Sequence, residues 1–166
     1  MKITLQQCIF LISNLAKKQT RLLNSLNSVY YMPLTVNGKD VSDKIRAAEM
    51  KDDLHTMDLI TQDLVTLKSA LSVANNKHKI GKKTLFAVLE EVRVKRDLLS
   101  NYEYALSRNI TSVETGVGVV RYGILNEDLL KEKYEALEKE VNRLSEQIDS
   151  VNASVEIEVK LLSEEE

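Results

Sequence analysis

The sequence predicts a mainly α protein of long antiparallel helices, a helical bundle with coiled-coil-like seams, that carries one small β element. Two observations predict the helices. Apolar residues recur in alternating steps of three and four along long segments, and aromatic residues make up only 5% of the chain, with no Trp. A third observation predicts the β element: apolar and charged residues alternate over 155–160, and the best second strand covers 117–124.

The first predicted helix has one apolar seam. A polar residue in such a seam can fix the register of a helical assembly, and Gln19 is the single polar member here. Met32-Pro33 ends the helix, because proline disfavours helical geometry in the residue before it. The seam consists of Leu5, Cys8, Ile12, Leu15, Gln19, Leu22, Leu26 and Val29.

A turn and a second helix follow. Asn37-Gly38 between short apolar runs predicts a small hairpin or an ordered turn. Ser42 or Asp43 then caps a helix that runs to about Ala74. Its inward residues are Met50, Leu54, Met57, Leu64, Leu67 and Leu71.

Residues 77–83 form a basic turn, after which Thr84 caps a third helix and Asn126 caps a fourth. The third seam contains Leu85, Leu89, Val92, Leu99 and Leu106. The fourth seam is the most regular and contains Leu130, Tyr134, Leu137, Val141, Leu144, Ile148 and Val151.

The segment SVETGVGVVRYG, residues 112–123, holds three of the five glycines. Its spacing GxGxxxxG departs from the dinucleotide fingerprint, and it lacks the Gly-Lys-Ser/Thr ending of a phosphate-binding P-loop. Glycines in a strand permit bends or close approach of another backbone, so we interpret them as structural. The two predicted strands flank a fourth helix roughly 39 Å long. Pairing them between subunits is easier than within one chain, which predicts a homo-oligomer.

Composition bounds the protein further. The length suits a single helical domain, residues 1–166, with a C-terminal strand. One cysteine fits a reducing cytoplasm, and the longest apolar run, residues 8–12, is too short to span a membrane.

Residues 126–166 hold 13 acidic and 5 basic residues, which leaves 12 acidic and 18 basic in 1–125. Complementary helix faces account for this asymmetry. The basic residues are dispersed, so we expect no nucleic-acid partner.

Several segments carry a resemblance. They are, in chain order, MKITLQQCIFLISNLAKKQTRLL, LKSALSVANN, KKTLFAVLEEV, VVRYGIL and IDSVNASVEIEV. This order resembles the septicolysin-like family of small bacterial and phage-associated helical proteins, over most of the chain. The chain departs from that pattern at Ala153, where the family tends to carry Trp, and at the late Arg96-Asp97 pair. The family has no established activity, and its toxin-like label implies a membrane-active toxin as the least favoured function. The apolar residues of the first helix are needed for its seam, so we expect no lysis by the folded protein.

Residues that could carry catalysis are few. His55 and His78 lie in different elements, and neither is at a metal-ligand spacing from another His or Cys. Cys8 lies in a helical seam, where cysteine is usually a small buried hydrophobe. The carboxylates lie on solvated helix faces. We therefore expect no enzyme, no catalytic residue, no metal and no cofactor.

We predict a non-enzymatic, self-associating helical binding or scaffold protein. The alternative is an oligomeric sponge that sequesters a small anionic, nucleotide-like signalling molecule, as a phage anti-defence protein would. Arg121 and Tyr122 motivate this alternative, because an arginine beside an aromatic ring can hold a phosphate and stack on a base. Arg108 precedes the same segment and can join them. The competing interpretation pairs Arg121 with Glu156 or Glu158 and packs Tyr122 on a helix.

Overall fold

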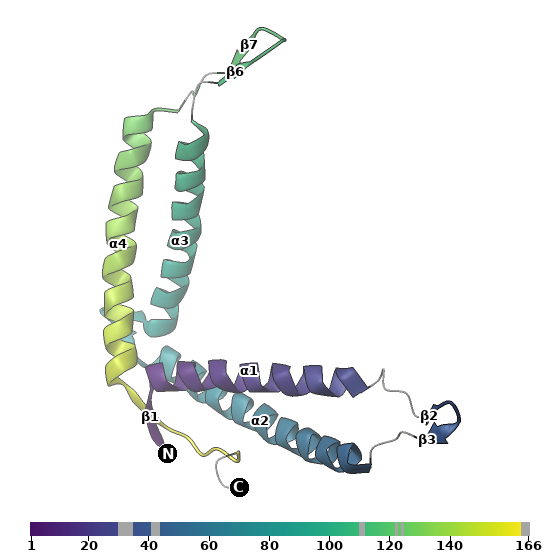
Figure 1. Cartoon of the computed structure of the whole chain (residues 1–166). Coiled ribbons are helices and arrows are strands. Elements are labelled where there is room, and N and C mark those ends of the chain that lie inside the picture. The colour runs from purple at the N-terminus through teal and green to yellow at the C-terminus, as the bar shows by residue number, and fades with distance from the viewer. Residues whose placement is uncertain (30–34, 41–43, 110–111, 122, 124, 164–166) are drawn as a thin grey trace. The chain divides into compact units, whose positions relative to one another are not determined.

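The computed structural model describes residues 1–29, 35–40, 44–109, 112–121, 123 and 125–163. Its described part is mainly α, as predicted, with long helices and small two-stranded sheets (Figure 1). The helices are α1 (Leu5–Val29), α2 (Lys44–Lys77), α3 (Leu85–Arg108) and α4 (Glu127–Ser154). The strands are β1 (Lys2–Thr4), β2 (Thr35–Val36), β3 (Lys39–Asp40), β4 (Lys79–Ile80), β5 (Lys83–Thr84), β6 (Ser112–Glu114), β7 (Val119–Arg121) and β8 (Glu156–Glu158).

The chain forms two compact units. The first unit contains Met1–Ala74 and Asn152–Glu166, and the second contains Asn75–Val151. The first unit pairs α1 with α2, and the second pairs α3 with α4. Both pairs are antiparallel, because residues late in one helix contact residues early in the other.

In the first unit, polar contacts fix the register of the two helices. The Cys8 thiol donates to the Leu67 carbonyl at 3.6 Å, and Gln19 Nε2 donates to Thr61 Oγ1 at 2.9 Å. Gln19, the polar member of the predicted seam, therefore bonds across to α2. Burial raises the pKa of the Cys8 thiol, which fits the predicted role of a small buried hydrophobe.

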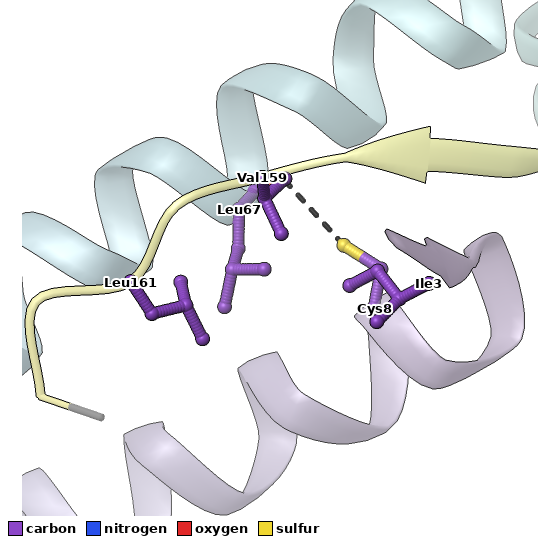
Figure 2. Packing of buried hydrophobic residues seen from close by; sticks show 5 residues of the cluster. All are labelled: Ile3, Cys8, Leu67, Val159 and Leu161. Carbon is purple, nitrogen blue, oxygen red and sulfur yellow. Dashed lines mark hydrogen bonds between the residues drawn. The ribbon is translucent and has the colours of Figure 1, made fainter. Parts of the chain in front are cut away.

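The core of the first unit gathers residues from both helices and from the two ends of the chain. Figure 2 shows the side chains of Ile3 and Cys8 close to Leu67, with the segment that carries Val159 and Leu161 passing beside them. All five are at most 5% exposed. Partly buried side chains packed around this cluster are Leu11, Ile12, Leu15, Ala70, Leu71 and Ile157.

A strand does form within the predicted range 155–160, as β8 at Glu156–Glu158, but the predicted partner was wrong. β8 pairs antiparallel with β1, with Ile157 opposite Ile3, and residues 117–124 contribute to a different sheet. The physical reason is the core just described, because β1 enters α1 beside β8 and both strands bury side chains against Leu67. Backbone bonds extend the pairing on both sides, from Leu5 N to the Val155 carbonyl and from Val159 N to the Met1 carbonyl, each 3.0 Å.

Asp63 anchors the chain beyond β8. This α2 residue is only 1% exposed, and its carboxylate accepts hydrogen bonds from Leu162 N at 2.7 Å and Ser163 N at 3.0 Å. Burial by itself would raise the pKa of Asp63, but hydrogen bonds from Leu162 and Ser163 outweigh burial and lower it. The carboxylate thus ties the C-terminal segment to α2.

Two hairpins occupy predicted turns. Asn37 and Gly38 take φ values of 51° and 74° between β2 and β3, the left-handed pair of a type I′ turn. The basic turn at 77–83 holds the β4–β5 hairpin, which we had not predicted, with Gly81 at φ 62°. The predicted helix end at Met32-Pro33 and the predicted cap at Ser42 or Asp43 lie outside the described residues, as do the side chains of Val29 and Met50.

The second unit matches its predicted caps and seams. Thr84 accepts a hydrogen bond from Ala87 N at 3.2 Å, and Asn126 accepts one from Leu129 N at 3.0 Å, so both residues cap their helices. Buried residues come from predicted seam positions on both helices, with Val88 added to the predicted set. They are Leu85, Val88, Val92, Val141, Leu144 and Ile148.

The glycine-rich segment 112–123 is a hairpin of its own. β6 pairs with β7, with Val113 opposite Val120, and it extends beyond the ends of α3 and α4 (Figure 1). Gly116 and Gly118 take φ values of 98° and 66° in its turn, a region that favours glycine. At Gly123 a Cβ would lie 2.7 Å from the Asn109 carbonyl oxygen, so this glycine permits close approach of two backbones. The predicted structural role of the glycines is confirmed.

Candidate binding surfaces of the second unit

Of the three predicted ligand-binding residues, the structure describes Arg108, at the end of α3, and the backbone of Arg121, in β7. Arg108 is in the last turn of α3, and its guanidinium carbon lies 5.3 Å from the centroid of the Tyr104 ring. Its observed aromatic neighbour is therefore Tyr104, one turn earlier on the same helix. Arg121 ends β7, where its backbone pairs with Ser112. Tyr122 lies outside the described residues.

The competing interpretation of Arg121 placed it beside the strand of Glu156 and Glu158. The strand next to β7 is β6, so the strand adjacency behind this interpretation was wrong, and the side chain of Arg121 lies outside the described residues. Glu156 instead forms an ion pair with Lys2 on β1, its own neighbouring strand. That ion pair raises the pKa of Lys2, first through the hydrogen bond to Glu156.

Apolar side chains are exposed on and beside the β6–β7 hairpin. Val113 is 65% exposed and Val117 is 70% exposed, and Val113 and Val120 lie directly opposite each other across the two strands. The exposed set, hereafter the hairpin patch, consists of Val113, Val117, Val119, Val120, Leu125 and Leu129. Val119 pairs with Glu114, so it lies on the other face of the hairpin from Val113 and Val120. Exposed apolar residues that share one face commonly mark a binding surface, and Val113 and Val120 form such a pair.

A groove lies where the β4–β5 hairpin meets α3 and α4. It encloses about 310 Å³, and we call it the basic groove. Apolar residues Ile80, Val88 and Leu144 line part of it. Its polar lining consists of Gly81, Lys82, Lys83, Glu91, Glu140, Arg143 and Gln147.

An ion-pair network runs beside this groove. Glu91 accepts from Lys83 Nζ and from Lys95 Nζ, each at 2.6 Å, and Lys95 also contacts Glu140 at 2.8 Å. The hydrogen bonds from Lys83 and Lys95 lower the pKa of Glu91 to about 2. The hydrogen bonds to Glu140 and Glu91 raise the pKa of Lys95. These shifts keep Glu91 and Lys95 charged at neutral pH.

A second groove of about 330 Å³ lies between α3 and α4, and we call it the mixed groove. Its cations are engaged: Arg96 donates to Ser145 Oγ at 2.9 Å, and Arg93 pairs with Glu90 at 2.8 Å. Asp97 and Asp149 contribute two carboxylates to the same lining. The mixed groove thus offers exposed negative charge and no unengaged arginine.

Among the described residues, no group of three or more His, Cys, Asp or Glu side chains could hold a metal ion. No helix in the described part of the chain is long and apolar enough to cross a membrane. The sequence analysis marked part of the basic groove, residues 80–83 in a basic turn and Leu144 in a helical seam. It did not single out the other lining residues, which are Val88, Glu91, Glu140, Arg143 and Gln147.

No protein-family model, curated protein or solved structure matches this chain. The resemblance to the septicolysin-like family therefore stays a prediction.

Proposed function

We propose that the protein is a non-enzymatic, self-associating helical binding or scaffold protein, and that it associates through the hairpin patch. The observation that carries this proposal is the exposure of the valines on both strands of the β6–β7 hairpin. Val113 and Val120 stand opposite each other on one face, so together they make a small apolar surface.

The hairpin itself favours a partner. A two-stranded hairpin is marginally stable in water, and three or more strands with an apolar face are needed for independent stability. The outer edge of each strand also presents backbone donors and acceptors that a further strand can bond. A second copy of the hairpin supplies both the strands and the apolar face.

Exposed apolar side chains support the same conclusion. Large apolar side chains are exposed on several described elements, the residues of the hairpin patch among them. Burial of such surface against a partner is favourable by about 25 cal/mol per Å².

The pKa of Glu91 fits a structural role for this carboxylate. General acid–base catalysis at neutral pH works best with a pKa near the working pH. The pKa of Glu91 is shifted in the opposite direction, to about 2, by hydrogen bonds from two lysines. This carboxylate has a structural role, because Glu91 on α3 binds Lys83 of the β4–β5 hairpin as well as Lys95 on its own helix.

Analytical ultracentrifugation of the full chain tests the proposal. The variant V113T/V120T keeps the β-branched shape and removes part of the apolar surface. Val73→Thr is a matched control, because Val73 is similarly exposed, at 67%, but lies on α2. We expect the dissociation constant of self-association to rise at least tenfold in the double variant and to stay unchanged in the control. A monomeric wild-type chain at micromolar concentration, or equal effects in both variants, would refute the proposal.

A further inference from the structure

We propose that the basic groove binds a small phosphate-bearing anion through Lys82 and Arg143. This site is independent of the hairpin patch, and the inference does not rest on self-association. It assigns a ligand class to Lys82, which the sequence placed in a basic turn, and to Arg143, which the sequence analysis did not single out.

The groove has the dimensions of a small-molecule site. Its volume of about 310 Å³ falls at the lower end of the range of roughly 300–1,000 Å³ for ligand pockets. Val88 and Leu144 are buried at 1% and 7% exposure, so they supply an apolar wall. Polar groups around an apolar wall are the usual composition of such sites.

The charges around the groove are not balanced internally. Both carboxylates of the lining are already engaged, Glu91 by Lys83 and Lys95 and Glu140 by Lys95. Within the described part of the chain, the side chains of Lys82 and Arg143 make no ion pair or hydrogen bond. The groove therefore keeps two cations whose donors are available to a ligand.

Lys82 and Arg143 are chemically suited to phosphate. Arginine presents a planar fork that binds two phosphate oxygens at once, and lysine adds a compact point charge. Gln147 adds an amide that can donate to a third oxygen. Lys77, the last residue of α2, and Lys79, in β4, lie close to Lys82 in the sequence and add positive charge to this region, which favours the approach of an anion.

The hairpin that carries Lys82 is held in place before any ligand arrives. Leu85 N, at the start of α3, donates to the His78 carbonyl at 2.8 Å. Lys83 binds Glu91 at 2.6 Å, one residue after Lys82. Both contacts fix the β4–β5 hairpin to α3, so binding costs little ordering of the backbone.

The mixed groove provides an internal contrast. It has a similar volume and shares α3 and α4, but Arg93 and Arg96 are engaged and two carboxylates line it. The carboxylates of Asp97 and Asp149 would oppose a phosphate there, and the arginines already make other contacts. Binding driven by general surface charge would not distinguish the two grooves, whereas the proposed site does.

Isothermal titration calorimetry of the full chain with inorganic pyrophosphate tests the proposal. We expect saturable binding by the wild type and about tenfold weaker binding by both Lys82→Gln and Arg143→Gln. Arg93→Gln, in the mixed groove, should bind as the wild type does. The absence of saturable binding by the wild type, or equal losses in all three variants, would overturn the proposal.

Amide NMR of the wild type with pyrophosphate gives a second measurement that needs no variant. The shifted amides should cluster at Gly81, Lys82 and Gln147, and shifts spread evenly over other basic segments would contradict the site. Titration with a single-stranded oligonucleotide tests whether the bound phosphate belongs to a small anion or to a polynucleotide. If it binds more tightly than pyrophosphate through the same two residues, the ligand is a polynucleotide and the small-anion proposal fails.

Discussion

Replacement of Glu91 by Gln should destabilise the second unit in a pH-dependent way. Glu91 is the central carboxylate of the network, because it accepts from both Lys83 and Lys95. Glutamine keeps the size of the side chain and removes its charge. The variant therefore tests the electrostatic contribution with little change in packing.

The lowered pKa of Glu91 sets an upper limit on how much free energy of unfolding the Glu91→Gln variant can lose. It falls from 4.5 to about 2, and each unit corresponds to about 1.4 kcal/mol, so the ceiling is about 3 kcal/mol. Water screens part of this interaction, since the side chain of Lys83 is 59% exposed. We expect a net loss of about 1–2 kcal/mol from the free energy of unfolding at neutral pH.

The same pKa fixes the direction of the pH dependence. A carboxylate whose folded pKa is lowered contributes its full stability above the unfolded pKa, near 4.5, and loses it as pH falls toward about 2. The stability difference between wild type and Glu91→Gln should therefore shrink across that interval. Urea unfolding followed by circular dichroism at several pH values measures it.

Glu90→Gln is the matched control. Glu90 is the preceding residue, and it pairs with Arg93 at 2.8 Å with both side chains largely exposed. An exposed pair of this kind contributes at most about 0.5 kcal/mol. If Glu91→Gln and Glu90→Gln lose equal stability at neutral pH, or if the Glu91→Gln difference persists unchanged at about pH 2, the electrostatic reasoning is wrong.

Helices and caps were predictable because their signals are local. The three-four spacing on α4 identified Val141, Leu144 and Ile148, and all three are buried. Thr84 and Asn126 were readable as caps because their side chains bond backbone groups three residues ahead. On α2 the prediction was less accurate, because apolar and polar residues are not cleanly separated onto two faces of this helix. Leu54 was predicted to face inward but is 45% exposed, and the fully buried Ile60 was missed.

Strand pairing was not predictable, because the partner depends on packing between distant segments. β1 has three residues, too few to display a period of two. Its pairing with β8 is decided by the shared core around Leu67. The segment 117–124 looked like a strand in need of a distant partner, but a turn at Gly116–Gly118 lets it pair with the residues just before it.

The basic groove shows the same limit for the candidate site. Lys82 and Arg143 are far apart in sequence, and each alone is an ordinary exposed cation. Lys82 and Arg143 are available to a ligand because Lys95 pairs with both Glu91 and Glu140. Without Lys95, these two carboxylates could pair with Lys82 and Arg143 instead. Composition cannot report which charges are already paired.

Two further predictions concern the core and the glycine-rich hairpin. Leu67→Ala should lower the free energy of unfolding, measured in urea, by about 3–4 kcal/mol, because Leu67 is fully buried in the core of the first unit. Val65→Ala is the control, and it should lower the free energy of unfolding by under about 0.5 kcal/mol because Val65 is 61% exposed. Similar losses in both variants would contradict that core. Gly123→Ala should detach the exit of the β6–β7 hairpin from α3. Its Cβ would lie 2.5 Å from Asn109 Oδ1, the atom that accepts from Leu125 N at 3.1 Å, so the side chain of Asn109 must move and that hydrogen bond must break. Amide hydrogen exchange should then speed up at Leu125. Gly116→Ala is the control, since its Cβ meets open space and its cost is backbone strain alone, at φ 98°. If the Leu125 amide exchanges as slowly in Gly123→Ala as in the wild type, close backbone approach does not explain this glycine.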